Sequence, residues 1–212
     1  GPPNGTTINT STSQFNFTVI DRFSTSFTCN LSINNTIVDA SFNANNGSIT
    51  TRTVSRLTDG HKLWNVTCKD HVNNTNSSVA YFLNISVPPT VSLLSPTDGA
   101  TTNFQSLNFT YTPTDNSNFS KCEFIVDGLM NFTNTTIFNA VPNNFSLQNI
   151  EPGRHNWTVN CTDTIGLTSI AAARNFTVDI QAPNTTLLYP PTASIVSDLI
   201  VLFNFTALDD FD

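Results

Sequence analysis

Short runs in which apolar and polar residues alternate recur along the chain, and turn residues separate them. One such run has a face formed by Trp157, Val159 and Cys161 and an opposite face formed by Asn156, Thr158 and Asn160. The strands expected in this half of the chain are residues 90–94, 107–112, 121–126, 144–149, 155–162 and 174–180. Runs of this length and period, with Gly, Pro and Asx turns between them, predict an all-β chain built of β-sandwiches.

The chain repeats itself at an interval of 93 residues, from Gly60 to Gly153. The sequence Gly-His-Lys-Leu-Trp-Asn-Val-Thr-Cys-Lys-Asp at 60–70 returns as Gly-Arg-His-Asn-Trp-Thr-Val-Asn-Cys-Thr-Asp at 153–163. The same interval separates Cys29 from Cys122. An internal repeat of this length indicates tandem copies of one structural unit.

A third copy begins near the end of the sequence. The segment Pro-Thr-Val-Ser-Leu-Leu-Ser-Pro at 89–96 reappears as Pro-Asn-Thr-Thr-Leu-Leu-Tyr-Pro at 183–190. We therefore predict one β-sandwich domain at 1–88, a second at 89–182, and the two-strand start of a third repeat, or a donor-strand tail, at 183–212.

This pattern resembles the tandem immunoglobulin-like or fibronectin-III-like repeats of archaeal or bacterial cell-surface glycoproteins. The resemblance covers nearly the whole chain and is most specific in the Trp-Val-Cys-Asp strands that contain Trp64 and Trp157. It implies tandem immunoglobulin-like β-sandwich domains that serve as a spacer, adhesive or polymer-forming module, and it brings no catalytic residues. The first copy departs from the pattern, because only Gly1 and Pro2 precede Pro3 and the Leu-Leu first strand is missing.

Composition and charge exclude several classes of function. Only 11% of the 212 residues are charged and the formal net charge is −7, so the chain has no basic stripe with which to bind nucleic acid. No run approaches the roughly 18 consecutive apolar residues of a membrane helix, so we expect no membrane span in this segment. No Gly-x-Ser-x-Gly motif is present and only two Glu occur, so we expect no enzymatic activity.

The four cysteines form two equally spaced pairs, and the chain has no Cys-x-x-Cys motif. We expect two disulfides, one in each domain, between Cys29 and Cys68 and between Cys122 and Cys161. Closing a loop of about 40 residues is expected to stabilise a small domain by roughly 3–4 kcal/mol. The alternative is four buried thiols. Disulfides would place the protein in an oxidising compartment, and Gly1-Pro2 fits either a tag-cleavage scar or a signal-peptidase product.

Asparagine followed by x-Ser/Thr is strongly over-represented. Ser and Thr make up 53 of the 212 residues, so chance would place roughly 7 of the 29 Asn in this context. The sequence has 20 such acceptor sites, at Asn4, Asn9, Asn16, Asn30, Asn34, Asn46, Asn65, Asn73, Asn76, Asn84, Asn108, Asn118, Asn131, Asn134, Asn144, Asn156, Asn160, Asn175, Asn184 and Asn204. We therefore expect dense N-linked glycan, which would also keep a chain of few charges in solution. The alternative is that Asn-x-Thr is polar filler for outward strand positions.

The three histidines lie close to the repeated strand. His61 and His155 fall at nearly equivalent places inside it, and His71 follows it. No second His, Cys or Glu stands at metal-ligand spacing, so structural or surface roles are favoured over catalysis or metal binding.

In each copy an aspartate follows the second Cys by two residues: Asp70 in the first copy and Asp163 in the second. We expect each to cap a turn. The alternative is a calcium site at a domain junction, shared with Asp98 or Asp115. Because capping is favoured, no metal is expected, and the only expected non-protein groups are N-linked glycans.

The C-terminal segment is apolar but too short to form a domain. Its apolar residues lie around Leu187 and in the run 199–205. Two strands cannot bury a core alone, and their free edges would aggregate. We therefore expect this tail to complete the first domain of a neighbouring subunit by strand addition, which would build a head-to-tail filament. The residues expected to take part are Leu187, Leu188, Ile200, Val201, Leu202, Phe203 and Phe205. The alternative is that the chain simply continues into a third domain.

Three functions remain open from the sequence. The leading one is a structural subunit of an extracellular filament or cell-surface coat, heavily N-glycosylated, whose partners are copies of itself. The second is a binding module, such as an adhesin or receptor stalk. The third is an accessory part of a secreted enzyme.

Overall fold

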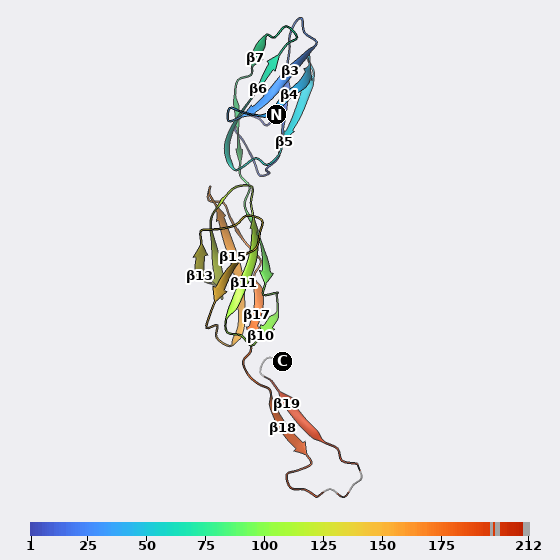
Figure 1. Ribbon diagram of the computed structural model, residues 1–212, viewed down its shortest axis with the longest axis vertical. Coiled ribbons are helices and arrows are strands. Elements are labelled where there is room, and N and C mark those ends of the chain that lie inside the picture. The colour runs from blue at the N-terminus through green and yellow to red at the C-terminus, as the bar shows by residue number, and fades with distance from the viewer. Residues whose placement is uncertain (196, 198–199, 210–212) are drawn as a thin grey trace.

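The computed structural model describes residues 1–195, 197 and 200–209 (Figure 1). Every regular element among these residues is a strand, which confirms the all-β class. Figure 1 shows two β-sandwiches end to end along the long axis, with a two-stranded hairpin beyond the second. Within this part of the chain, no helix is long and apolar enough to cross a membrane.

The first sandwich contains eight strands. They are β1 (Thr6–Ile8), β2 (Ser13–Thr18), β3 (Ser26–Ile33), β4 (Thr36–Asn45), β5 (Ile49–Val54), β6 (Gly60–Lys69), β7 (Thr75–Ser77) and β8 (Tyr81–Ile85). One sheet has the order β1-β8-β6-β3-β4, with β7 paired to β6, and the other consists of β2 and β5. The edge strand β1 runs parallel to β8, whereas the remaining pairs are antiparallel.

The second sandwich repeats this arrangement with one strand more. Its strands are β9 (Thr90–Ser95), β10 (Ala100–Thr102), β11 (Leu107–Thr114), β12 (Phe119–Val126), β13 (Leu129–Asn134), β14 (Asn143–Leu147), β15 (Gly153–Asp163), β16 (Thr168–Ile170) and β17 (Arg174–Val178). The larger sheet has the order β10-β17-β15-β12-β13, with β16 paired to β15. The smaller sheet has three strands, β14-β11-β9.

Each sandwich has its own hydrophobic core between its two sheets. The buried residues form two separate clusters, one drawn from residues 15–85 and the other from residues 93–178. In the first core Phe15 meets Trp64 edge-on with 5.1 Å between ring centroids, and in the second Phe109 meets Trp157 with the same separation. Inward positions alternate with outward ones along each strand, and the one tryptophan of each copy lies at an inward position, where it packs in the core.

Two hairpins are fixed by residues that tolerate positive φ. Asn34 and Asn35 (φ 49° and 62°) connect β3 to β4, and Asp127 and Gly128 (φ 50° and 77°) connect β12 to β13. Two-residue loops with positive φ at both positions match the twist of antiparallel strands. In both copies such a hairpin therefore adds the edge strand of the larger sheet, β4 in the first and β13 in the second.

All six strands expected in the second copy are present, and three that were not expected are added: β10, β13 and β16. The alternation of β15 is confirmed for Trp157, Val159 and Cys161, which are fully buried. It is wrong for Thr158, which was expected to face solvent and is buried, since its hydroxyl donates a hydrogen bond to the carbonyl of Ala171 at 2.7 Å. The segment after β16 covers this position.

The C-terminal hairpin consists of β18 (Asn184–Tyr189) and β19 (Asn204–Leu208). Tyr189 pairs with Asn204, in the same way that Ser95 of β9 pairs with Thr110 of β11. Every residue of both strands is exposed. The hairpin is thus the counterpart of β9 and β11, without the larger sheet that would cover it among the described residues.

Candidate functional site

The 20 glycan acceptor asparagines all lie on the surface. Fourteen are exposed, and the other six, Asn30, Asn46, Asn65, Asn84, Asn134 and Asn160, are half-buried. The buried asparagine of the described chain is Asn143, which is not in an acceptor sequence. Its amide binds the backbone of Phe138 and Val141, so it closes the loop before β14. Buried and acceptor asparagines are therefore separate groups, as a glycan-bearing surface requires.

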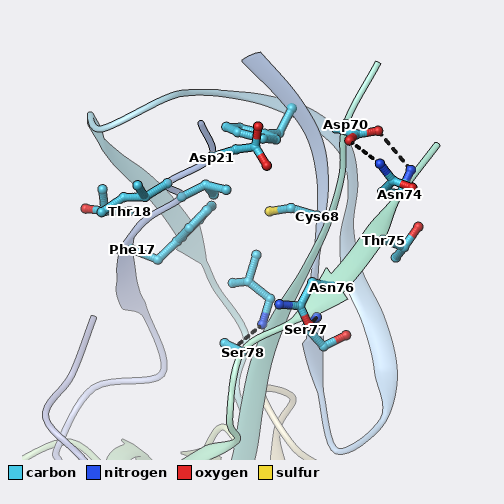
Figure 2. Close-up of a pocket in the computed structure, with 14 residues that line it drawn as sticks. Phe17, Thr18, Asp21, Cys68, Asp70, Asn74, Thr75, Asn76, Ser77 and Ser78 are labelled. Carbon is cyan, nitrogen blue, oxygen red and sulfur yellow. Dashed lines mark hydrogen bonds between the residues drawn. The ribbon is translucent and has the colours of Figure 1, made fainter. Parts of the chain in front are cut away.

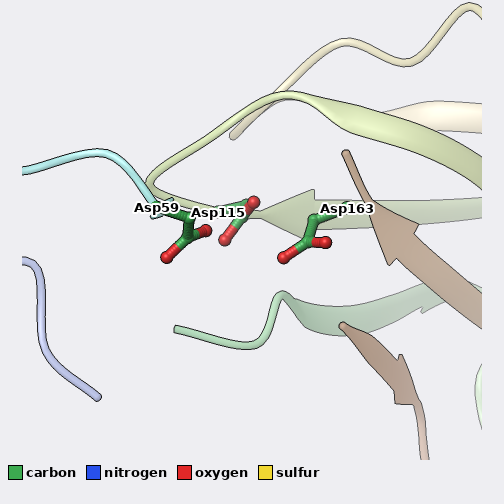
Figure 3. A group of neighbouring side chains, drawn as sticks. All are labelled: Asp59, Asp115 and Asp163. Atoms are coloured by element: carbon green, nitrogen blue, oxygen red, sulfur yellow. The ribbon is translucent and has the colours of Figure 1, made fainter. Parts of the chain in front are cut away.

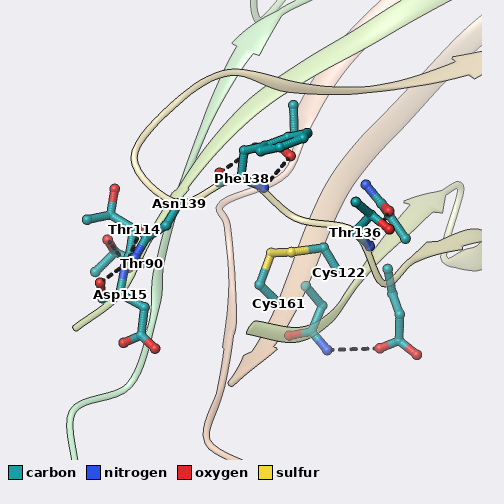
Figure 4. Close-up of a disulfide and its surroundings, with 12 residues drawn as sticks. Thr90, Thr114, Asp115, Cys122, Thr136, Phe138, Asn139 and Cys161 are labelled. Atoms are coloured by element: carbon teal, nitrogen blue, oxygen red, sulfur yellow. Dashed lines mark hydrogen bonds between the residues drawn. A yellow bond between two sulfur atoms is a disulfide. The ribbon is translucent and has the colours of Figure 1, made fainter. Parts of the chain in front are cut away.

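Both disulfides are present, with the pairing expected from the repeat. Cys29 is joined to Cys68 and Cys122 to Cys161, each with 4.1 Å between Cα atoms. Figure 4 shows the second of these bridges. Each bridge links directly opposite residues of neighbouring antiparallel strands, β3 with β6 and β12 with β15. In immunoglobulin domains the corresponding bridge spans the two sheets. Here each bridge lies within one sheet, so it fixes strand register rather than sheet spacing.

The smaller sheet of the first sandwich has an open edge. In the second sandwich β9 pairs with β11 and also contacts β15 and β16. Their counterparts in the first sandwich are β2, β6 and β7, but no described strand takes the place of β9. The sequence predicts that the first copy lacks its first strand, and the described fold has no strand in that place.

A groove of about 350 Å³ occupies the position that β9 fills in the other sandwich (Figure 2). We call it the strand groove. It is lined by Phe17, Val19 and Ile20 on the β2 side, Val66 and Cys68 in β6, and Thr75–Ser77 of β7. Cys68 is partly exposed in this groove, whereas its counterpart Cys161 is fully buried. Polar side chains, among them Asp21, Asp70 and Asn74, also line the groove, so it is only partly apolar. A partly apolar groove beside an unpaired strand edge can accept an added β-strand.

The start of the chain lies at one end of the strand groove. The amino group of Gly1 donates a hydrogen bond to the carbonyl of Asn16 at 2.7 Å. This pair corresponds to Ser95 and Thr110, the last β9–β11 pair of the second sandwich. A strand in the groove would therefore run antiparallel to β2 and end where Gly1 lies.

The residues expected to donate a strand are exposed or partly exposed in the hairpin. Leu187 is 81% exposed, whereas its counterpart Leu93 is 6% exposed. Leu188, Ile200, Leu202, Phe203 and Phe205 are exposed and Val201 is half-buried. The expected run 199–205 is not one strand: β19 begins only at Asn204, and the four residues from Ile200 to Phe203 precede it. Leu199 lies outside the described residues.

The histidines have structural contacts. His155 lies between the carboxylate of Asp127 (2.7 Å from Nδ1) and the carbonyl of Glu151 (2.8 Å from Nε2). Burial alone would lower the pKa of His155, but the hydrogen bonds to Asp127 and Glu151 and the charge of Asp127 together raise it. His71 pairs with the hydroxyl of Ser24, and His61 packs edge-on against Phe82.

The two aspartates that follow the repeated Cys both cap turns, as expected. Asp70 Oδ1 accepts hydrogen bonds from the N–H groups of Val72 (2.9 Å) and Asn74 (2.8 Å). Asp163 Oδ1 accepts them in the same way from Ile165 (2.9 Å) and Leu167 (2.8 Å). In both copies the carboxylate therefore accepts hydrogen bonds from the N–H groups two and four residues after the aspartate, and these bonds close the turn.

The structure also brings Asp163 together with Asp115, at the end of the second sandwich that faces the first. Asp98, the other residue considered for a junction site, is elsewhere and accepts a hydrogen bond from the N–H of Asn175. The third member of the cluster is Asp59, from the loop before β6 (Figure 3). Sequence reasoning missed Asp59, because its counterpart in the second copy is Pro152 and no repeat marks it.

No protein-family model and no curated protein sequence matches this chain. Among solved structures, the chain is similar to the fibronectin(III)-like modules of Clostridium thermocellum CbhA, with 16% identity, 84% of this chain and 90% of that chain covered, and a TM-score of 0.36. It is similar to the titin domains z1z2 in complex with telethonin, with 10% identity, coverage of 82% and 91%, and a TM-score of 0.34. Extracellular domains 3–5 of Drosophila OTK give 12% identity, coverage of 92% and 68%, and a TM-score of 0.39. At these identities and TM-scores the similarities say nothing about the function of this chain.

Proposed function

We propose that this protein is a structural subunit of an extracellular filament or cell-surface coat, densely N-glycosylated, in which a β-strand supplied from outside the first sandwich fills the strand groove. The observation that carries the proposal is the groove itself. The second sandwich contains a first strand, β9, that has no counterpart among the described strands of the first, and the place of that strand is open and partly lined by apolar side chains. The exposed hairpin β18–β19 and the groove of the first sandwich are different surfaces of one chain, so pairing between copies would run head to tail.

The surface supports a location outside the cell. Two disulfides persist in oxidising compartments. The 20 acceptor sites are spread over both sandwiches and the hairpin, and none is buried.

The segment of this chain that suits the groove is β18. Its sequence, Asn-Thr-Thr-Leu-Leu-Tyr, matches Thr-Val-Ser-Leu-Leu-Ser of β9 in the placement of its leucine pair. In a groove-bound strand Leu187 would take the place of Leu93 and lie over Val66 and Cys68. Burying one leucine side chain contributes about 1.5–3 kcal/mol. To use the same edge as β9, β18 must leave β19, and an isolated two-stranded hairpin is marginal enough to allow the exchange.

A cysteine trap tests the strand assignment. Thr18 and Thr186 correspond to Thr112 and Ser92, which are directly opposite residues in the second sandwich. The chain has no free cysteine among its described residues, so Thr18→Cys with Thr186→Cys adds the two reactive thiols. We expect oxidation to give a ladder of crosslinked subunits on a non-reducing gel. The matched control is Thr18→Cys with Thr185→Cys, in which the second thiol points to the other face of the strand.

Two results would overturn strand donation by a neighbouring subunit. One is an equal ladder, or no ladder, from the two cysteine pairs. The other is the persistence of filaments in a protein that lacks residues 184–212, examined by electron microscopy. If instead residues that precede Gly1 in a longer chain fill the groove, that longer chain stays monomeric and no ladder forms.

A further inference from the structure

Three aspartates converge where the two sandwiches meet (Figure 3). Asp59 comes from the loop before β6 in the first sandwich, whereas Asp115 directly follows β11 and Asp163 is the last residue of β15. One carboxylate oxygen of each lies within 4.8 Å of the others. Two oxygens that share one calcium ion, each about 2.4 Å from it, lie no more than about 4.8 Å apart. The spacing is therefore that of ligands of a single ion.

Asp163 carries an oxygen that has no protein partner. Its side chain is 1% exposed, and Oδ2 has no hydrogen bond although Oδ1 caps the turn. The equivalent residue in the first sandwich, Asp70, caps its turn identically, but its Oδ2 accepts a hydrogen bond from Asn74 at 2.9 Å. Turn capping thus explains one oxygen of Asp163 and leaves the other buried and aimed into the cluster. A buried carboxylate oxygen without a partner is costly unless a cation meets it.

The neighbouring carboxylates are also unpaired. Oδ2 of Asp59 and both oxygens of Asp115 are buried without a hydrogen-bond partner. None of the ion pairs between described residues involves the cluster. The Lys62 ammonium binds the backbone carbonyl of Asp59 (2.9 Å) and the hydroxyl of Thr58. It therefore does not neutralise the carboxylates directly.

Asp115 lies within the same 4.8 Å cluster as Asp59 and Asp163, and neither of its carboxylate oxygens has a hydrogen-bond partner. Three like charges held together in this way call for a positive ligand.

From this arrangement we infer that Asp59, Asp115 and Asp163 bind a hard divalent cation, of which calcium suits the site best, and that the ion ties the two sandwiches together. All three donors are carboxylate oxygens, which favour calcium or magnesium over zinc or copper. The amide oxygen of Asn116, whose amide nitrogen donates to Asp59 Oδ1, is also buried without a partner. This inference departs from the expectation that the chain holds no metal.

The junction is already aligned to receive the ion. The amide of Asn116 donates hydrogen bonds to the carbonyl of Leu57 (2.9 Å) and to Asp59 Oδ1 (3.1 Å), and the N–H of Asp59 donates to the hydroxyl of Ser117 (2.8 Å). Asp59 Oδ1 also accepts from the N–H of Val87, in the linker between the sandwiches. These contacts fix the loop that carries Asp59 against the second sandwich, so the cation would meet a preformed set of oxygens.

The first copy carries counterparts of two of the three ligands, and the third copy carries a counterpart of one. Asp115 corresponds to Asp21 in the first copy and to Asp209 in the third, at intervals of 94 residues, and Asp163 corresponds to Asp70. Only the third ligand, Asp59, comes from the preceding sandwich.

Calorimetric titration of the chelator-treated protein with CaCl₂ tests the site. We expect one ion per chain, with a dissociation constant on the order of 10⁻⁴–10⁻³ M, as in other extracellular modules. Asp115→Asn and Asp163→Asn should each weaken binding at least about tenfold, because each removes one charge while an amide oxygen can still accept hydrogen bonds. Asp98→Asn, the same substitution in the same sandwich but outside the cluster, should bind as the unmodified protein does.

A second measurement uses the unmodified protein alone, so it does not depend on whether a variant folds. Small-angle X-ray scattering of the unmodified protein, with calcium and with chelator, should show a narrower distribution of end-to-end distances with calcium. The inference is wrong if neither CaCl₂ nor MgCl₂ gives a saturable heat up to 10 mM, or if Asp115→Asn and Asp163→Asn both bind as tightly as Asp98→Asn. Binding with an unchanged scattering profile would refute the tie between the sandwiches.

Discussion

At the scale of single residues, the alternation of apolar and polar residues correctly predicts burial where a side chain contacts only the two sheets of its own sandwich. Trp157 and Val159 are buried because only the two sheets of their own sandwich determine which face is covered. Thr158 is different, because the connection after β16 folds over it. Asp59 could not have been found by the same reasoning, since its neighbours come from another sandwich. An equal spacing of 94 between Asp21, Asp115 and Asp209 was the available signal for part of that site.

A residue-scale prediction concerns His155. Its raised pKa depends on hydrogen bonds to Asp127 and to the carbonyl of Glu151, and on the charge of Asp127. Because the folded-state pKa lies above that of an unfolded histidine, about 6.5, protonation stabilises the fold. This contribution is fully present below about pH 6.5 and is lost as the pH rises through the folded-state pKa.

The measurement is an NMR titration of the His155 ring nitrogens. In Asp127→Asn we expect a lower pKa for His155, since the amide can still accept the hydrogen bond from the N–H of Asn156 but carries no charge. Superimposable titration curves for the two proteins would show that Asp127 does not raise the pKa.

At the scale of elements, the strands with a buried face were predictable and the edges were not. Strands β10 and β16 have only three residues each, and β13 exposes Leu129, Met130 and Phe132. Such edge strands have no alternation to detect, although the Asp127-Gly128 turn indicated a hairpin. Register was also ambiguous: the Asn-Phe-Thr triplets align Phe17 with Phe109. The cores instead align Phe15 with Phe109, because each packs against the tryptophan of its sandwich.

An element-scale prediction compares two equivalent leucines. Leu93→Ala empties a core position that is 6% exposed and should lower the free energy of unfolding of the second sandwich by about 2–5 kcal/mol. Leu187→Ala changes a side chain that is 81% exposed in the single subunit and should change its stability by less than about 0.5 kcal/mol.

Urea unfolding followed by tryptophan fluorescence gives both values. In a Trp64→Phe background Trp157 alone reports on the second sandwich, because the chain has two Trp. Assembly should respond in the opposite order: Leu187→Ala should weaken filament formation, if β18 is the donated strand. A large loss of stability from Leu187→Ala in the single subunit would mean that the hairpin is packed rather than available.

At the scale of the whole molecule, two sandwiches and a hairpin lie in line, and the interactions that hold them differ in kind (Figure 1). Within each sandwich an aromatic core holds the two sheets together, and one disulfide joins two strands of the larger sheet. Between the sandwiches the described contacts are hydrogen bonds from loops and the three clustered carboxylates. The sandwich domains were predictable because their sequence repeats, whereas the residue that the first sandwich contributes to the junction, Asp59, has no counterpart in the second copy.

The whole-molecule prediction is that glycan covers the sides of this rod. Exposed apolar side chains such as Phe23 (81% exposed) and Leu129 (72%) are scattered over a surface with few charges, and glycan would keep them from associating. In natively produced material we expect at least half of the 20 acceptor asparagines to carry glycan. The intact mass should therefore lie well above the 23.1 kDa of the polypeptide and return to that value after chemical deglycosylation.

Occupancy should also follow exposure from site to site. Exposed acceptors, such as Asn108 in β11 and Asn156 in β15, should be modified more fully than half-buried ones, such as Asn46. The side-chain nitrogen of Asn46 already donates a hydrogen bond to the carbonyl of Asp21 at 2.7 Å, so a sugar there must be accommodated in a crowded loop. Glycopeptide mapping gives the occupancy of each site. A native mass near 23 kDa would rule out the glycan coat, and uniform occupancy would show that exposure in the folded chain does not decide where sugar is attached.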